Sequence, residues 1–343
     1  MPIPFIIAGV SIIAGSVGIK KGIDSVSDNK EAKRIMTNAE RLFNRNKNKV
    51  EKKKDQTVAV LEEYGKLKLF IWDKQFGRFV DAVSKVRNVE LQGNVVLDIN
   101  LVEAIDEKEL ITMKDISLKA GEILTGGATA LGAGTLSGIA ATGGATLFAS
   151  ASTGTAISSL AGVAATNATL AWFGGGSLAA GGLGMAGGTA ILGGIVAGPI
   201  LAVGGSILAS KAKKNLAEAK ITHTEARKAG KEMRKMYAVL DAVEGYTNQF
   251  RDVTEKLNER FNNVLTDLEN IISSNANGAE ETIDYKKLSK DEQQLLHLSY
   301  EFAQVIKMTL DTSLMDQQGA PVENCDEALV PANKLLEHSI ELA

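Results

Sequence analysis

The residues that could support chemistry in this chain are few, and the first of them form a glycine pattern. Gly182, Gly184 and Gly187 satisfy G-x-G-x-x-G, the spacing with which a loop approaches a dinucleotide pyrophosphate. Such a loop needs a strand before it and an acidic ribose-binding residue about 20 residues after it. The first acidic residue after Gly187 is Glu218, which is too far along the chain for this role. A phosphate-binding loop is also missing, since no Gly-Lys-Ser or Gly-Lys-Thr occurs in the chain. The sequence therefore argues against nucleotide binding and hydrolysis.

Metal chemistry is also poorly supported by the sequence. The histidines His223, His297 and His338 fall on separate expected helices, none belongs to an H-E-x-x-H motif, and none neighbours the single cysteine, Cys325. Because zinc needs three or four converging ligands, we expect no metal site and no cofactor. The carboxylates are spaced as on helix surfaces, opposite Lys and Arg, so no general acid and base pair stands out. We expect that the protein is not an enzyme.

The most unusual feature of the chain is an uncharged stretch at 123–210. It contains no Asp, Glu, Lys, Arg or His and consists mainly of Gly, Ala, Thr and Ser with scattered Leu, Ile and Val. A membrane-spanning helix needs roughly 20 residues, so this stretch is long enough for several crossings. Its aliphatic residues are diluted by small polar ones, and the mean hydropathy of the whole chain is only +0.01. This intermediate polarity favours conditional insertion over a permanent anchor.

Small residues recur within the uncharged stretch at four-residue spacing, which places them on one face of a helix. In lipid, small residues let helix backbones approach closely, so these faces predict helix packing in a bilayer. Two aromatic residues before three glycines are typical of an interfacial turn at the tip of a hairpin. The predicted packing residues are Gly134, Gly138, Gly184, Gly188, Gly194 and Gly198, and the predicted tip is Trp172, Phe173, Gly174, Gly175 and Gly176.

Long charged segments with helical periodicity must position this stretch, one on each side. The first helix is expected over 27–86, and its lysine-rich middle, 46–55, should project from any core as a solvated face, with an anionic-lipid patch as the alternative. The second, over 211–273, carries the clearest apolar stripe, a seam expected to pack antiparallel on the first. The expected fold is all-α: a long antiparallel helical bundle or coiled coil with a Gly/Ala-rich apolar helical hairpin.

The remaining segments fill in the expected organisation. The apolar N-terminal segment lacks the layout of a secretory signal, because its lysines, Lys20 and Lys21, follow the apolar core, so we expect it to stay in the chain. A small β-hairpin is expected near 89–98, and Ser289 with Glu292 predicts a capping box at the start of a later helix. The five expected regions are 1–19, 20–122, 123–210, 211–273 and 274–343.

The order of a long helix, an apolar Gly/Ala-rich hairpin and a long returning helix resembles the α-helical pore-forming toxins of the haemolysin E and tripartite enterotoxin type. The likeness covers about 27–310, is architectural, and assigns no functional residue. The segment 165–178 also looks like one that recurs in uncharacterised bacterial membrane proteins, some of them labelled chemotaxis proteins. The first resemblance implies a helical protein that acts on membranes.

We therefore expect a membrane-inserting, pore-forming protein whose apolar domain is sequestered until it inserts and oligomerises. Its partners would be a lipid bilayer and either further copies of itself or a helical partner protein. Nucleic acid is not expected, because the formal net charge is -3. The alternative is a constitutive multispan scaffold whose cytoplasmic coiled helices recruit a partner protein. The expected localisation is at a membrane, with a soluble cytoplasmic form, and secretion remains open.

Overall fold

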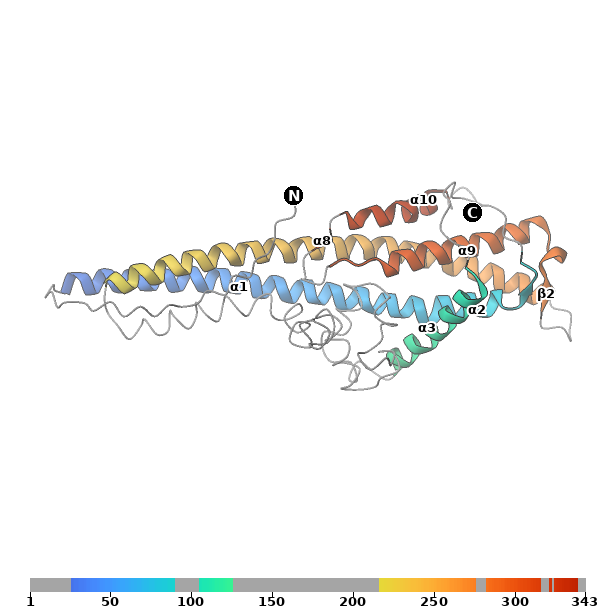
Figure 1. Ribbon diagram of the computed structural model, residues 1–343, viewed down its shortest axis with the longest axis horizontal. Helices are drawn as coiled ribbons and strands as arrows, with labels where there is room; N and C mark the ends of the chain where they lie inside the picture. The colour runs from blue at the N-terminus through green and yellow to red at the C-terminus, as the bar shows by residue number, and fades with distance from the viewer. Residues whose placement is uncertain are drawn as a thin grey trace.

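The computed structural model shows an elongated helical molecule (Figure 1). Of the 343 residues, the structure describes 26–89, 105–125, 216–275, 282–315, 321–322 and 324–338. Helices account for most of these residues, which confirms the expected all-α class. No helix within the described ranges is both long and apolar enough to cross a bilayer.

The described elements follow one another along the chain as helices with two short strands. They are α1 (Val26–Phe70), the π-helix η1 (Ile71–Phe76), α2 (Gly77–Val83), β1 (Val86–Arg87), α3 (Glu107–Thr125), α8 (Leu216–Asn275), β2 (Ile283–Asp284), the 3-10 helix η6 (Tyr285–Lys287), α9 (Lys290–Asp311), the 3-10 helix η7 (Cys325–Leu329) and α10 (Val330–His338). We call residues 26–56 and 216–244 the stalk, and the other described residues the head.

α1 and α8 lie side by side along the length of the molecule and run in the same direction (Figure 1). Their contacts advance together along both helices, from Thr57 with Leu240 to Arg78 with Glu269. The expected antiparallel packing of these two helices is therefore wrong. An apolar stripe at heptad-like spacing defines which face of a helix is buried, but it does not define the direction of the partner.

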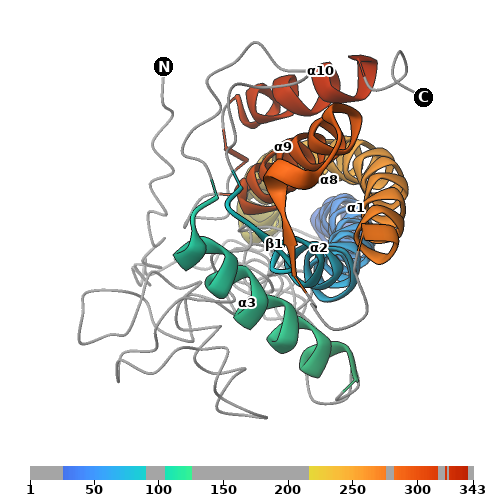
Figure 2. The ribbon, with the colours of Figure 1, turned by 90° about the vertical axis from the view of Figure 1, so that its right-hand side faces the viewer.

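Two other helices run opposite to this pair. α9 is antiparallel to α1 and α2, since Tyr300 packs edge-on against Phe79 while the later Leu310 accepts a hydrogen bond from the earlier Lys68. α3 crosses the pair obliquely in the opposite sense, because Ser117 lies against Gly77 while the later Gly121 lies against the earlier Asp73 (Figure 1, Figure 2). Seen end-on, α3 lies on one side of the α1 and α8 pair and α10 on the other (Figure 2). The head is thus a bundle of mixed direction.

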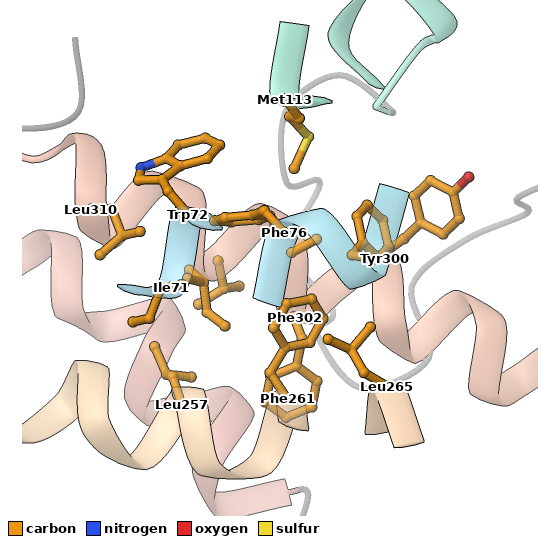
Figure 3. Close-up of a cluster of buried hydrophobic side chains, with 14 of the residues drawn as sticks. Ile71, Trp72, Phe76, Met113, Leu257, Phe261, Leu265, Tyr300, Phe302 and Leu310 are labelled. Atoms are coloured by element: carbon orange, nitrogen blue, oxygen red, sulfur yellow. The ribbon is translucent and has the colours of Figure 1, made fainter. Parts of the chain in front are cut away.

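The core of the head is one continuous cluster rich in aromatic side chains (Figure 3). Phe261 of α8 lies with its ring centroid 6.1 Å from that of Phe76, 6.0 Å from that of Phe79 and 6.1 Å from that of Phe302. All four side chains are fully buried. Since each buried aromatic side chain removes a large apolar area from water, this cluster is the main source of stability in the head.

The core of the stalk is thinner, because only two of the described helices contribute to it. The lysine-rich part of α1 is solvated only in part, contrary to the expectation: Lys49 and Lys52 are exposed, but Val50 is 1% exposed and Lys53 is 7% exposed. The side chains of Val50 and Lys53 enter the seam with α8. The cluster consists of Ala39, Phe43, Val50, Ala226, Ala229, Met233 and Leu240.

Two local features test the expectations for the shorter segments. The capping box of α9 is confirmed: Ser289 Oγ accepts a hydrogen bond from the Glu292 amide, and Glu292 accepts one from the Ser289 amide. The hairpin expected near 89–98 lies outside the described residues apart from Val89. The described sheet instead pairs β1 with β2 in parallel, Val86 opposite Ile283. This pairing joins segments that are distant in the sequence.

Candidate functional site

The residues predicted to act in the membrane lie outside the described ranges. This holds for the packing glycines Gly134, Gly138, Gly184, Gly188, Gly194 and Gly198, and for the tip residues Trp172, Phe173, Gly174, Gly175 and Gly176. The structure does describe the elements at both ends of the uncharged stretch. α3 ends at Thr125 and leads into the stretch, and α8 begins at Leu216, shortly after it.

α3 is seated closely on the π-helix η1. Ser117 Oγ donates a hydrogen bond of 3.1 Å to the Asp73 carbonyl. A Cβ at Gly77 would lie 2.7 Å from Ser117 Oγ, and a Cβ at Gly121 would lie 2.7 Å from Asp73 Oδ1. Two glycines therefore permit the close approach of α3: Gly77 on the α2 side of the contact and Gly121 on α3 itself.

α3 carries large apolar side chains that water reaches, with Ile111 and Leu118 on its outward side and Leu124 in the row of Ser117 and Gly121 that faces η1. Ile111 is 58% exposed, Leu118 is 60% exposed and Leu124 is 37% exposed. Phe70, one turn before the Asp73 that faces Gly121, is 42% exposed. Of the seven large hydrophobic side chains that are exposed in the described part of the chain, these four lie on α3 or at the end of α1 beside it. We call Ile111 and Leu118, which lie one heptad apart on the outward side of the helix, the α3 apolar face.

The far end of the stalk holds the first described residue of both long helices. Since α1 and α8 are parallel, Val26 and Leu216 lie at the same end of the molecule (Figure 1). α3 reaches the level of Asp73 in η1 at Gly121. At 1.5 Å per residue of α1, the end of α3 lies roughly 60 Å from the stalk end along the helix axis.

A polar layer interrupts the seam between stalk and head. Lys53 Nζ lies 2.5 Å from Asp241 Oδ1 and 3.2 Å from Glu244 Oε2, and Thr57 Oγ1 donates to the Leu240 carbonyl at 3.2 Å. Burial lowers the pKa of Lys53, but the two carboxylates outweigh burial and raise its pKa overall. Lys53 is therefore charged in the folded protein. We call Lys53, Thr57 and Glu244 the polar layer.

A second buried lysine lies inside the head. Lys68 is 1% exposed, its Nζ donates a hydrogen bond of 2.8 Å to the Leu310 carbonyl at the end of α9, and it lies 4.7 Å from the centroid of the Tyr64 ring. Burial lowers the pKa of Lys68 to about 7, against an opposing effect of Asp311. An amine with a lowered pKa is a possible nucleophile. Here the amine is sealed from solvent and bonded to a helix end, so its observed contacts are structural.

His297 and Cys325 are held by contacts within the folded head. His297 Nε2 lies 2.9 Å from the Tyr285 hydroxyl and its ring stacks on the tyrosine ring, while Cys325 is a buried free thiol. Among the described residues, no group of three His, Cys, Asp or Glu side chains is placed to hold a metal ion.

Comparison with known proteins supplies no identity for this chain: no family, no curated protein and no solved structure matches it. The candidate site therefore rests on the uncharged stretch and on the elements that flank it. The sequence did not point to the α3 apolar face. The available signal was the seven-residue step from Ile111 to Leu118, off the main stripe of that helix.

Proposed function

We propose that this protein inserts the uncharged stretch at 123–210 into a membrane, after storing it against the folded helices in water, and that it oligomerises there to form a pore. The observation that carries the proposal is the complete absence of ionic side chains over this stretch, between two rigid and highly charged helical elements. In lipid, small residues allow close helix packing, whereas in water glycine weakens a helix by roughly 1 kcal/mol.

The parallel direction of α1 and α8 supports the end of the stalk as the membrane-proximal end. The apolar segment 1–19 precedes Val26, and the uncharged stretch ends shortly before Leu216, so both join the stalk at one end. Lysines lie in the short connections: Lys20, Lys21, Lys211, Lys213 and Lys214. At no more than about 3.5 Å per residue, these connections keep all five within roughly 20 Å of the helix ends. Cationic residues beside apolar segments favour anionic headgroups.

The α3 apolar face supports storage of the stretch in water. Its two exposed side chains, Ile111 and Leu118, lie on the helix that leads directly into the uncharged stretch, and Phe70 is exposed on the adjoining end of α1. An uncharged segment that follows α3 directly in the sequence can reach this surface with little loss of chain entropy, because few residues separate the two along the chain. Covering it would remove apolar area from water.

A liposome assay tests insertion. We expect the purified protein to release a trapped dye, and we expect a variant with Gly134, Gly138, Gly184 and Gly188 all changed to Leu to keep its helix content and lose release. Gly245→Leu is the control, because no atom lies within 4 Å of a Cβ at this α8 position. Absence of release by the unmodified protein at every lipid composition would remove the insertion proposal. Release by the fourfold variant would remove the packing role of the small residues.

Photocrosslinking tests storage without a membrane. A benzophenone amino acid at Leu118 should crosslink to peptides from 123–210 of the same chain, as read by mass spectrometry. The matched control is the same probe at Ile221, which is 58% exposed on the stalk. Crosslinks from Leu118 to a second copy, or equal crosslinking from both positions, would contradict storage on the α3 apolar face.

Cell fractionation separates the proposal from a resident scaffold. A chain that stores its apolar stretch should appear partly in the supernatant after carbonate extraction, and its soluble pool should bind added liposomes. Recovery only in the membrane pellet would favour a constitutive multispan scaffold that recruits a partner through the stalk.

A further inference from the structure

A groove lies on the stalk where the lysine-rich part of α1 faces α8. Its volume is about 580 Å³, and it lies above the buried side chains of Val50 and Met233. Cavities of this size are typical of small-molecule sites, which range from roughly 300 to 1,000 Å³. The groove is therefore large enough for a ligand of metabolite size.

The charged side chains that line the groove are all cationic. They are Lys49, Lys52, Lys53 and Arg234, and the remaining polar lining includes the amides of Asn46 and Gln56. The excess is local, because residues 46–56 hold five lysines and two acids while the whole chain has a formal net charge of -3. Such a concentration of one sign in a hollow attracts ligands of the opposite sign.

The four cations are not equivalent. Lys53 is held by Asp241 and Glu244, which direct its ammonium group into the polar layer. Lys49, Lys52 and Arg234 are exposed and form no ion pair with any residue of the described ranges. Three cationic groups from two helices thus face one hollow without a carboxylate to neutralise them. The ring of Tyr237, 40% exposed, forms part of its wall.

We propose that this groove binds a small ligand that carries two or more phosphate groups. The Arg234 guanidinium supplies a planar pair of donors that suits phosphate oxygens, and the lysine ammonium groups supply point charges at two further positions. The amides of Gln56 and of Asn46, which also donates to the Leu42 carbonyl at 2.8 Å, line the same groove. A single carboxylate would leave at least two of the three unpaired cations without a counter-charge, so a polyanion fits better.

The position of the groove bears on the source of the phosphate groups. Lys49 lies 23 residues after Val26, so the groove is roughly 35 Å from the stalk end along α1. Headgroups of a bilayer contacted by the stalk end would not reach it, which favours a free polyphosphate compound over a phosphorylated lipid. The inference does not depend on membrane insertion.

Titration calorimetry with the full-length protein and tripolyphosphate, at physiological ionic strength, tests the site. We expect saturable binding of one equivalent, and we expect Arg234→Gln to weaken it about tenfold to a hundredfold, as for loss of hydrogen bonds to a charged group. Arg227→Gln is the matched control, because Arg227 is an exposed arginine one heptad earlier on the same face of α8 and does not line the groove. Its affinity should equal that of the unmodified protein.

A second pair of variants tests the lysines. Lys49→Gln with Lys52→Gln should weaken binding, whereas Lys33→Gln with Lys66→Gln, which removes the same charge from exposed positions elsewhere on α1, should not. Equal weakening in both pairs would show diffuse attraction and overturn the site, as would the absence of any saturable binding. Vesicles containing a phosphorylated inositol lipid form the second arm: binding to them that is lost in Arg234→Gln and kept in Arg227→Gln would assign the ligand to a lipid headgroup.

Discussion

The stalk and the head share the helices α1 and α8 but are stabilised differently. In the head, α2, α3 and α9 pack against the pair and bury a continuous aromatic core. Among the described residues of the stalk, α1 and α8 pack only on each other, and their cluster contains a single aromatic side chain, Phe43. The polar layer of Lys53, Thr57 and Glu244 lies between them. The same helices therefore serve as a stable base at one end and as a slender, marginally stabilised extension at the other.

The comparison implies that the two regions respond differently to the same change. The head resists local opening because many side chains must separate together, whereas a two-helix seam opens with fewer lost contacts. A region that must approach a membrane or a ligand benefits from this lower local stability. Four predictions test the difference, beginning with the largest effect.

Removal of one aromatic ring should distinguish the regions most strongly. Phe261→Ala creates a cavity among Phe76, Phe79 and Phe302, and we expect it to lower the free energy of unfolding by about 3–5 kcal/mol. Phe43→Ala in the stalk should lower it by less than about 2 kcal/mol, because the side chains around Phe43 come from only two described helices and can relax into the space. Urea unfolding followed by circular dichroism measures both. Equal losses would contradict the distinction between stalk and head.

The stability of the head should depend on pH because the pKa of Lys68 is lowered by folding. Its pKa is lowered to about 7 in the folded protein from its ordinary value of 10.5, so between these values the unfolded chain binds more protons than the folded one. Stability should therefore rise with pH above 7, by at most about 1.4 kcal/mol per pH unit, and Lys68 should add no slope below pH 7. Lys68→Met should remove the rise.

The measurement is thermal unfolding from pH 7 to pH 10, with Cys325→Ser in both proteins. Burial raises the pKa of Cys325 above its usual value of 9.0, so that thiol acts in the opposite direction. Above pH 10 Tyr300 also opposes the rise, because burial raises its pKa to about 12. A rise of the same size in Lys68→Met would assign the slope to other groups.

The polar layer should be replaceable by an apolar one. Lys53→Leu alone should destabilise the protein by about 1–3 kcal/mol, because Glu244, at 22% side-chain exposure, loses its counter-charge. Lys53→Leu with Glu244→Leu should recover that loss, because an apolar pair needs no desolvated charge. Hydrogen exchange should then show greater protection in the stalk of the double variant. If the double variant is as unstable as the sum of the single variants, the pair is not coupled.

The smallest expected effect concerns two glycines in helices. Gly245→Ala should stabilise the protein by roughly 1 kcal/mol, because alanine favours the helix and no atom lies within 4 Å of the added Cβ. Gly77→Ala should gain nothing or lose stability, since its Cβ meets Ser117 Oγ at 2.7 Å and displaces a hydroxyl that bonds to the Asp73 carbonyl. Melting temperatures of the two variants provide the test. Equal stabilisation would show that α3 does not pack closely on η1.

Local sequence patterns were sufficient to predict the buried face of α8 and the start of α9. The stripe that contains Leu257, Phe261 and Leu268 is buried in α8, and the Ser289 capping box begins α9 as expected. These features depend on residues three or four positions apart, which meet on the same helix whatever surrounds them. The sequence also indicated two long helical segments, and α8 lies close to its expected bounds. The first was expected as one helix over 27–86, whereas α1 ends at Phe70 and continues as the π-helix η1 and then α2.

The candidate site was predictable only in part. The uncharged stretch is evident from composition, but the α3 apolar face, the groove and the two buried lysines were not indicated. Lys53 was expected on a solvated face, and it lies instead in the seam because Asp241 and Glu244 of α8 stand opposite it. The groove requires Lys49 of one helix and Arg234 of the other, which are far apart in the sequence.

The amino-acid sequence by itself determined that long helices form, which faces of the long helices are apolar, and that a long middle stretch lacks charge, because each of these properties depends on neighbouring residues. The tertiary structure decided that α1 and α8 run in parallel, that β1 pairs with β2, and that Lys53 and Lys68 are buried. These outcomes depend on which residue of a distant segment stands opposite, and a periodic apolar stripe can satisfy either direction with similar burial.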